Sequence, residues 1–458
     1  MSLIFLICSQ VFGLALGLIK SLVLPIFLSI EDFAFWQIYL LYTGYIAVFS
    51  FGFNDGLLVR YGKYDFNKLP LNLVGRSIKY FMFLIIALTS FIILISLLIP
   101  YNDKTLLFIF ITLNIPLVVL NGIFLFLLQS TNQIKKYSVY SVIDKFIMII
   151  TIFVFIYLDI KNIYVIIMVD MISRFIQIIL MYIEFHKLFK SEEDNQSTRK
   201  IISEIQKNIS RGSYILITNL IGMLLFGYGL FVIERFMSLK DYSLFSLGIS
   251  TTNILLLFIN AVSIVVFPYL SRLENNQVFS KVTQINFLTT HFSIFICNIY
   301  IIIVFILENY LEKYSDLLIF LPFIFLSVVL QIKFNIILYP TIKLLNKEKI
   351  IFKINLRLLI LSIIFTSLSV VYYHSLLYAA ITMYIVLYLR NYVLGKLISK
   401  DTKDTKDIKK VKYLELLSHI IFITIVLFFE NKFYLYTIYS IFILIIDAKK
   451  IVLRGKFI

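Results

Sequence analysis

Long apolar segments follow one another along nearly the whole 458-residue chain. Each is long enough to form the helix of about 20 residues that crosses roughly 30 Å of hydrocarbon. Their continuity argues against a transmembrane β-barrel, whose strands are about ten residues of alternating polarity. Because 60% of the residues are apolar and only 15% are charged, the chain is predicted to be an all-α integral membrane protein.

About fourteen transmembrane helices are expected. The last two segments are short, and a re-entrant hairpin is the alternative to two spanning helices there. The predicted segments are 3–28, 35–59, 78–100, 105–130, 139–158, 163–185, 213–233, 244–270, 285–307, 317–342, 351–372, 375–394, 413–429 and 433–446.

Two stretches of the chain repeat each other. Residues 29–36 (SIEDFAFW) resemble residues 238–245 (SLKDYSLF), 209 positions later (29 to 238), and Val-Val-Leu recurs at 118–120 and 328–330. Internal repeats are common in secondary transporters, where two similar halves move around a site at their interface. The predicted organisation is a six-helix bundle at 1–190, a cytoplasmic linker at 191–212, a second six-helix bundle at 213–397, a second cytoplasmic linker at 398–412, and two extra helices with a basic tail at 413–458.

The positive charge of the chain follows its predicted topology. The formal net charge is +16, but most Lys and Arg residues fall in alternate loops, which does not suggest a nucleic-acid partner. Positively charged loops stay in the cytoplasm during insertion. The chain is therefore predicted to be a multi-pass protein of the cytoplasmic (inner) membrane with both termini in the cytoplasm, and the basic loops would attract anionic membrane lipid.

Residues that would support an enzyme or a metal site are sparse. The chain has two cysteines and four scattered histidines, and no G-x-x-x-x-G-K-[ST] phosphate-binding loop. No cofactor, metal or catalytic residue is expected, and any uphill work would come from an ion gradient, a lipid-linked substrate gradient or a separate ATPase.

Charged residues inside the apolar segments are the candidate functional residues. A Lys or Arg at the centre of a transmembrane helix costs roughly 3 kcal/mol, so it usually faces a cavity or a partner. Only Asp144 and Asp170 are clear acidic residues in the same segments, and an excess of cations favours an anionic substrate. Arg174 can pair with Asp170 one helical turn away. For Lys20, Arg357 and Arg390, the alternative to a cavity is snorkelling, in which the long side chain extends to the membrane surface. The six candidates for binding an anionic headgroup are Lys20, Lys145, Arg174, Lys333, Arg357 and Arg390.

A second set of residues is suited to gating or ion coupling. Asp55 lies in the run Gly-Phe-Asn-Asp-Gly that closes the second segment, where glycines loosen the backbone. Arg60 follows this run, and Asp55 with Arg60 is predicted to form a cytoplasmic gate. An ordinary helix end is the alternative. The full gate or coupling set is Asp55, Arg60, Asp170, Glu234, Arg235 and Arg272.

These residues resemble a known family. Pro25, the repeated elements at 29–36 and 238–245, the run from Gly52 to Gly62, and Pro268 with Ser271-Arg272 are similar to the multidrug/oligosaccharidyl-lipid/polysaccharide (MOP) exporter superfamily, and more narrowly to Wzx-type flippases of O-antigen and capsule repeat units. The resemblance covers about residues 3–397, and the two extra helices depart from its simplest twelve-helix pattern.

The resemblance implies two six-helix bundles around a central cavity that opens alternately to either side. The implied substrate is an undecaprenyl-pyrophosphate-linked oligosaccharide, moved from the inner to the outer leaflet for surface polysaccharide (lipopolysaccharide O-antigen or capsule) biosynthesis. Cationic cavity residues would contact the pyrophosphate, and the implied partners are a proton or sodium counter-ion and other polysaccharide assembly proteins. Two alternatives remain open: a cation-coupled multidrug exporter of the same superfamily, and a membrane enzyme such as a polysaccharide polymerase.

Overall fold

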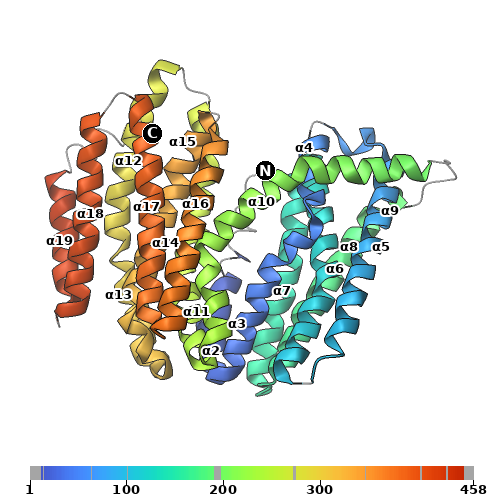
Figure 1. Ribbon diagram of the computed structural model, residues 1–458, viewed down its shortest axis with the longest axis horizontal. Coiled ribbons are helices and arrows are strands. Elements are labelled where there is room, and N and C mark those ends of the chain that lie inside the picture. Colours follow the sequence, from blue (N-terminus) through green and yellow to red (C-terminus); the bar gives the residue numbers. More distant parts are fainter. Residues whose placement is uncertain are drawn as a thin grey trace. The chain divides into compact units, whose positions relative to one another are not determined.

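The computed structural model describes residues 12–13, 15–62, 64–100, 102–189, 197–271, 275–345, 347–402, 405–429 and 432–447. Every regular element within these ranges is a helix, as the all-α prediction requires. The chain divides into two compact units, Met1–Leu220 and Ile221–Ile458, shown in blue to green and in green to red in Figure 1.

Unit 1 is a bundle of long helices joined by short helical turns (Figure 1). In it, α6 packs against α4, α5, α7 and α8, which makes α6 the central helix. Its elements are η1 (Ile19–Val23), α2 (Leu24–Phe27), α3 (Ile30–Tyr45), η2 (Ile46–Ser50), α4 (Phe53–Tyr61), η3 (Phe66–Lys68), α5 (Leu71–Ser96), α6 (Asp103–Ser130), α7 (Ile134–Tyr157), α8 (Ile163–Glu184), α9 (His186–Phe189) and the first part of α10 (Thr198–Phe236).

Unit 2 is built around α14, which packs against α11, α12, α17 and α18. The two additional helices, α18 and α19, stand side by side at the edge of the unit and pack on α12 (Figure 1). After the last part of α10, its elements are α11 (Leu239–Ser271), α12 (Asn275–Ile296), α13 (Ile299–Tyr310), η4 (Glu312–Ile319), α14 (Leu321–Lys333), η5 (Phe334–Leu338), α15 (Tyr339–Leu344), α16 (Glu348–Ser367), η6 (Leu368–Tyr372), α17 (Leu376–Thr402), α18 (Thr405–Phe428) and α19 (Lys432–Ile446).

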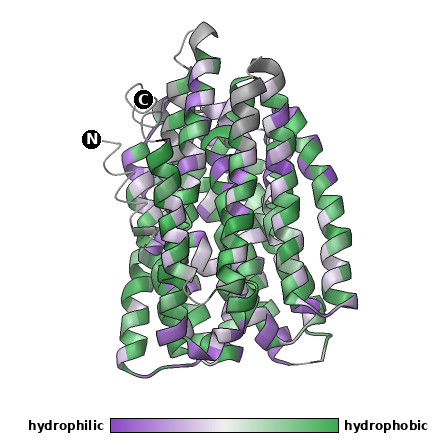
Figure 2. Ribbon diagram, turned by 90° about the vertical axis from the view of Figure 1, so that its left-hand side faces the viewer, coloured by the Kyte–Doolittle hydropathy of each residue, from purple (hydrophilic) through white to green (hydrophobic). Residues whose placement is uncertain are grey.

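Ten helices of the described chain are long and apolar enough to cross a membrane, and three shorter apolar helices accompany them. Together with α11, they correspond to the fourteen apolar segments of the sequence. Figure 2 shows apolar residues over most of the length of the helices, with hydrophilic residues near the helix ends and in patches partway along them. Large apolar side chains such as Phe83 and Leu98 are mostly exposed, as expected where lipid replaces water.

The repeated sequence element is a helix start. Ser29 accepts a hydrogen bond from the Asp32 backbone N–H at 3.0 Å, and its hydroxyl donates to the Asp32 carboxylate at 2.6 Å. Ser238 and Asp241 make the same two contacts, at 3.1 and 2.6 Å. Each pair caps the amino terminus of a long helix, α3 in unit 1 and α11 in unit 2. The repeat therefore specifies where the corresponding helix of each unit begins.

Replacing a cap serine with alanine should destabilise its own unit. Ser29→Ala or Ser238→Ala removes an acceptor for a helix N–H and is expected to cost about 1 kcal/mol, seen as a lower thermal unfolding midpoint of the purified protein. Ser210→Ala, on the exposed side of α10, serves as the control. Equal midpoints for all three variants would contradict the capping role.

Candidate functional site

Asp170 is the centre of a polar cluster inside unit 1. Its carboxylate accepts from Lys20 Nζ at 3.3 Å, from the Tyr39 hydroxyl at 2.8 Å and from Arg174 Nη2 at 2.8 Å. Only 4% of Asp170 is exposed. The predicted pairing of Asp170 with Arg174 is confirmed, and Lys20, 150 residues earlier in the chain, is a second cation on the same carboxylate.

A second layer of side chains holds this cluster in place. The Tyr39 hydroxyl accepts from Asn114 Nδ2 at 2.8 Å, and the Tyr39 ring stacks on Trp36 with centroids 5.5 Å apart. Lys20 Nζ lies 5.1 Å from the Trp36 ring centroid, within cation–π range. Sequence analysis did not identify Tyr39 or Asn114. The signal that could have found Asn114 is an amide in the middle of a long apolar segment.

Asp144 and Lys145 extend the cluster on α7. Asp144 lies within electrostatic range of Lys145, Arg174 and Lys20, and its buried Oδ1 has no hydrogen-bond partner among the described residues. Lys145 Nζ lies 3.8 Å from the position that a Cβ on Gly13 would occupy. Within the described part of the chain, no hydrogen bond or ion pair engages the Lys145 ammonium. The cluster therefore has three cations (Lys20, Lys145 and Arg174) and two carboxylates (Asp144 and Asp170), which gives it a formal charge of +1.

The polar stripe continues along α8 beyond Asp170. Gln177 donates to the Tyr140 backbone carbonyl at 2.6 Å and accepts from Asn121 Nδ2 at 3.0 Å. Ser173, between Asp170 and Gln177, is also buried. The interior of unit 1 therefore presents one connected polar face made by α6, α7 and α8.

Arg60 forms a second network at the end of α4. Its guanidinium donates to both carboxylate oxygens of Glu204, at 2.6 and 2.9 Å, and to the Asn208 side-chain oxygen at 2.6 Å. The Tyr61 hydroxyl donates to Glu204 at 2.6 Å. The sequence suggested Asp55 as the partner of Arg60, but the structure gives Arg60 a carboxylate from α10 instead. Arg60, Tyr61, Glu204 and Asn208 are called the Arg60 network below.

Glycines next to this network let α4 and α10 cross closely. A Cβ on Gly56 would lie 2.0 Å from the Asn208 carbonyl oxygen, and a Cβ on Gly212 would lie 1.9 Å from that of Gly52. Gly52 also has φ +84°, a conformation that favours glycine. The Gly-rich run is therefore required by a helix crossing within unit 1.

The other three headgroup candidates lie in unit 2, and two of them are buried. Lys333 is buried and donates to Glu415 at 2.7 Å and to the Thr290 hydroxyl at 3.1 Å. Arg390 is also buried and donates to Gln331 at 2.8 Å, with its Cζ 3.9 Å from the Phe334 ring centroid.

Arg357 and the remaining gate candidates occupy more exposed or undescribed positions. Arg357 is exposed on α16 and has no hydrogen bond or ion pair within the described ranges. Glu234 is buried near the end of α10, and the next residue, Arg235, is exposed. Arg272 lies outside the described residues.

Comparison with known proteins identifies the family. A family model described as "Polysaccharide biosynthesis protein" matches residues 2–274, more than half of the sequence, and the chain belongs to this family. No curated protein matches the sequence.

Solved structures of MOP transporters share the fold. The lipid II flippase MurJ in an inward closed conformation matches with a TM-score of 0.64 at 16% identity, over 97% of this chain and 98% of MurJ. A MOP superfamily transporter from Pyrococcus furiosus matches with a TM-score of 0.53 at 12% identity, over 90% of this chain and 96% of that one. A MATE transporter in complex with MaD5 gives 0.51 at 12% identity, over 89% and 96%. The chain therefore has the fold of MOP transporters, and the expected all-α, multi-pass membrane architecture is confirmed.

Removing the central carboxylate should destabilise unit 1. Asp170→Asn keeps the side-chain shape but leaves Lys20 and Arg174 without a buried counter-charge, and breaking a buried ion pair costs about 3 kcal/mol. We expect a clear drop in thermal unfolding midpoint in detergent. Asp316→Asn, which breaks an exposed Lys–Asp pair, is the control. Similar midpoints for the two variants would refute the central role of Asp170.

The Arg60 network should tolerate exchange of its charges. Arg60→Glu or Glu204→Arg alone places like charges in contact and should lower stability by about 2 kcal/mol, while the double exchange should restore part of the loss. Thermal unfolding of the four proteins in a double-mutant cycle measures this. An additive cycle would mean that the two side chains do not interact.

Proposed function

We propose that the protein is a flippase that moves undecaprenyl-pyrophosphate-linked oligosaccharide repeat units across the cytoplasmic membrane by alternating access. The family is named for polysaccharide biosynthesis, and one structure of the same fold is a flippase for the lipid-linked substrate lipid II. The buried cations supply the chemistry that a pyrophosphate headgroup requires. The repeat unit would serve the assembly of O-antigen or capsule.

Lys145 is the observation that carries this proposal. An ammonium inside the membrane is costly, yet Lys145 has no ion pair among the described residues, in contrast to Lys20 and Arg174. An anionic substrate would supply the counter-charge that Lys145 lacks. We propose that Lys145 contacts the pyrophosphate together with Lys20 and Arg174, and that Lys333, Arg357 and Arg390 contribute from unit 2.

Asp170 has a distinct role in this proposal. By accepting from three donors at once, it keeps Lys20 and Arg174 at fixed positions before substrate arrives. The pyrophosphate would then compete with one carboxylate for cations that are already oriented, so little side-chain entropy is lost on binding. Such electrostatic recognition selects the charged headgroup and leaves the sugar to other residues.

We propose that the gating residues act at the ends of the helices. The Arg60 network would hold the first part of α10 against α4, and the remaining helix ends would be the places where the other candidates act: Asp55, Glu234, Arg235 and Arg272. Asp170 also belongs to the coupling set because it is an intramembrane carboxylate. Both termini would face the cytoplasm, as the charge pattern predicts.

The test is leaflet transfer in reconstituted vesicles. With a defined polyprenyl-pyrophosphate sugar, Lys145→Met should reduce the transfer rate about tenfold or more, because a charge-assisted contact worth about 1.5 to 3 kcal/mol is lost. Lys161→Met, which removes an exposed loop ammonium paired with Asp159, should transfer at the normal rate. Equal rates for the two variants would exclude the proposed contact, and transport of a cationic dye without any lipid transfer would favour a drug exporter.

A further inference from the structure

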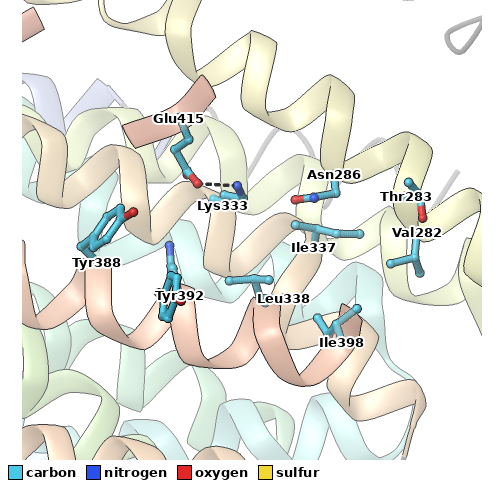
Figure 3. Close-up of a pocket in the computed structure, with 12 residues that line it drawn as sticks. Val282, Thr283, Asn286, Lys333, Ile337, Leu338, Tyr388, Tyr392, Ile398 and Glu415 are labelled. Carbon is cyan, nitrogen blue, oxygen red and sulfur yellow. Dashed lines mark hydrogen bonds and ion pairs between the residues drawn. The ribbon is translucent and has the colours of Figure 1, made fainter. Parts of the chain in front are cut away.

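Unit 2 contains an open pocket whose inner end is the Lys333–Glu415 ion pair. The pocket holds about 30 Å³ of space that water molecules can reach. Figure 3 shows Glu415 from α18 and Lys333 from α14 meeting at one end, with Asn286 of α12 close by and Tyr388 and Tyr392 on the α17 side. Four helices thus meet around one buried ion pair.

The ion pair lies deep in the membrane-spanning part of unit 2. Lys333 and Tyr388 are each 12 residues beyond the starts of their helices, at 321 and 376, and Glu415 is 13 residues before the end of α18 at 428. At 1.5 Å per residue, all three lie about 18 to 20 Å from the side predicted to be external. The pocket also reaches Ile398, ten residues further along α17 than Tyr388. It therefore leads from the ion pair toward the side predicted to be cytoplasmic.

The pocket has unused hydrogen-bond acceptors at its polar end. Glu415 uses only Oε2 in the described structure, for Lys333. Asn391, which lines the pocket and is 6% exposed, donates to the Leu330 carbonyl, but its Oδ1 has no partner among the described residues. A buried acceptor without a partner costs about 1 to 3 kcal/mol. The site therefore suits a ligand that supplies a hydrogen.

The helix geometry allows Lys333 to change partner. Lys333 is the last residue of α14 and is followed at once by the π-helical turn η5. Single π-turns inside α-helices occur frequently at functional sites. Lys333 also has a second acceptor in Thr290, so its ammonium remains hydrogen-bonded if the contact with Glu415 opens. Glu415 is then left as a buried carboxylate without its cation, and binding a proton relieves that cost.

We propose that Glu415 is a proton-binding site coupled to substrate movement, with Lys333 as its alternative partner. This inference rests on the proposed flippase function. When the protein is open to the outside and Lys333 turns away, a proton from external water binds a Glu415 carboxylate oxygen and forms the O–H bond. When the protein is open to the cytoplasm and Lys333 returns, that bond breaks and the proton passes through the pocket to cytoplasmic water. Lys333 keeps its own proton throughout, so the pair changes from a net charge of 0 to +1. The added charge offsets part of the charge of an anionic headgroup.

The surroundings of Glu415 favour a proton over a metal cation. Titratable groups within electrostatic range are Lys333 on α14, Tyr384 and Tyr388 on α17 and His419 on its own helix. From α12, the Thr290 hydroxyl accepts from Lys333, and the Asn286 and Thr283 side chains line the pocket. His291, further along α12, faces Asp447, which follows α19, at 3.1 Å. The described residues contain no cluster of three metal-ligating side chains, and the Lys333 ammonium beside Glu415 would repel a metal cation.

The experiment compares lipid transfer with and without a pH gradient in vesicles of the full-length protein. Wild type should respond to the gradient, since one proton moved across one pH unit is worth 1.4 kcal/mol, up to about a tenfold change in accumulation ratio. Glu415→Gln keeps the size of the side chain and should still transfer lipid, without gradient response. Asp316→Asn, in an exposed Lys–Asp pair, should respond as wild type does. A gradient response in Glu415→Gln, or none in wild type, would overturn the inference and leave the flippase proposal standing.

A spectroscopic readout separates the two proposals if no lipid transfer is found. Infrared difference spectra over a pH series should show a protonated carboxyl band that Glu415→Gln removes. Lys333→Gln, which takes away the partner cation, should extend that band to higher pH. The Glu415 site would be supported by this result even if the substrate were wrong. Identical bands in wild type, Glu415→Gln and Lys333→Gln would refute it.

Discussion

The compensation of charge inside a membrane determines how both units are built. A cation left alone in hydrocarbon would cost several kcal/mol. In the structure, specific partners compensate these charges. Asp170 serves Lys20 and Arg174 in unit 1, and Glu415 serves Lys333 in unit 2. Arg390 is held differently, by a glutamine and the face of Phe334. Replacing these groups with packed apolar residues would often be no less stable, so stability alone does not account for their presence.

The backbone is arranged to bring these partners together. The Ser-Asp caps start α3 and α11 at corresponding places in the two halves, and the α3 cap sets the register that places Tyr39 against Asp170. Glycines at 52, 56 and 212 allow the α4–α10 crossing that joins Arg60 to Glu204. The π-helical turn η1 contains Lys20, and the π-helical turn η5 directly follows Lys333. Local backbone features and buried charges therefore coincide.

The fold is predictable from the sequence because the length of each apolar segment is a local property of the chain. Membrane class, helix segments and the α8 pair Asp170–Arg174 all depend on residues close together in the chain. Partners that are distant in the chain could not be predicted from the sequence. Lys20 pairs with a carboxylate 150 residues away, and Arg60 pairs with Glu204 rather than with the nearby Asp55. Glu415 was missed because its segment was read as an addition to the twelve-helix pattern, whereas α18 supplies the partner of Lys333. A lone charge in an apolar segment thus predicts that a partner exists, without saying where it lies.

Recognition of a lipid-carried pyrophosphate by the intramembrane cations is the step on which the proposed function depends. Its most direct measurement is binding of three polyprenyl lipids to the purified protein by native mass spectrometry: the pyrophosphate, the monophosphate and the uncharged alcohol. The account predicts that affinity falls in that order, and that Lys145→Met narrows the difference between pyrophosphate and alcohol. Equal binding of the alcohol and the pyrophosphate by the wild-type protein would contradict it.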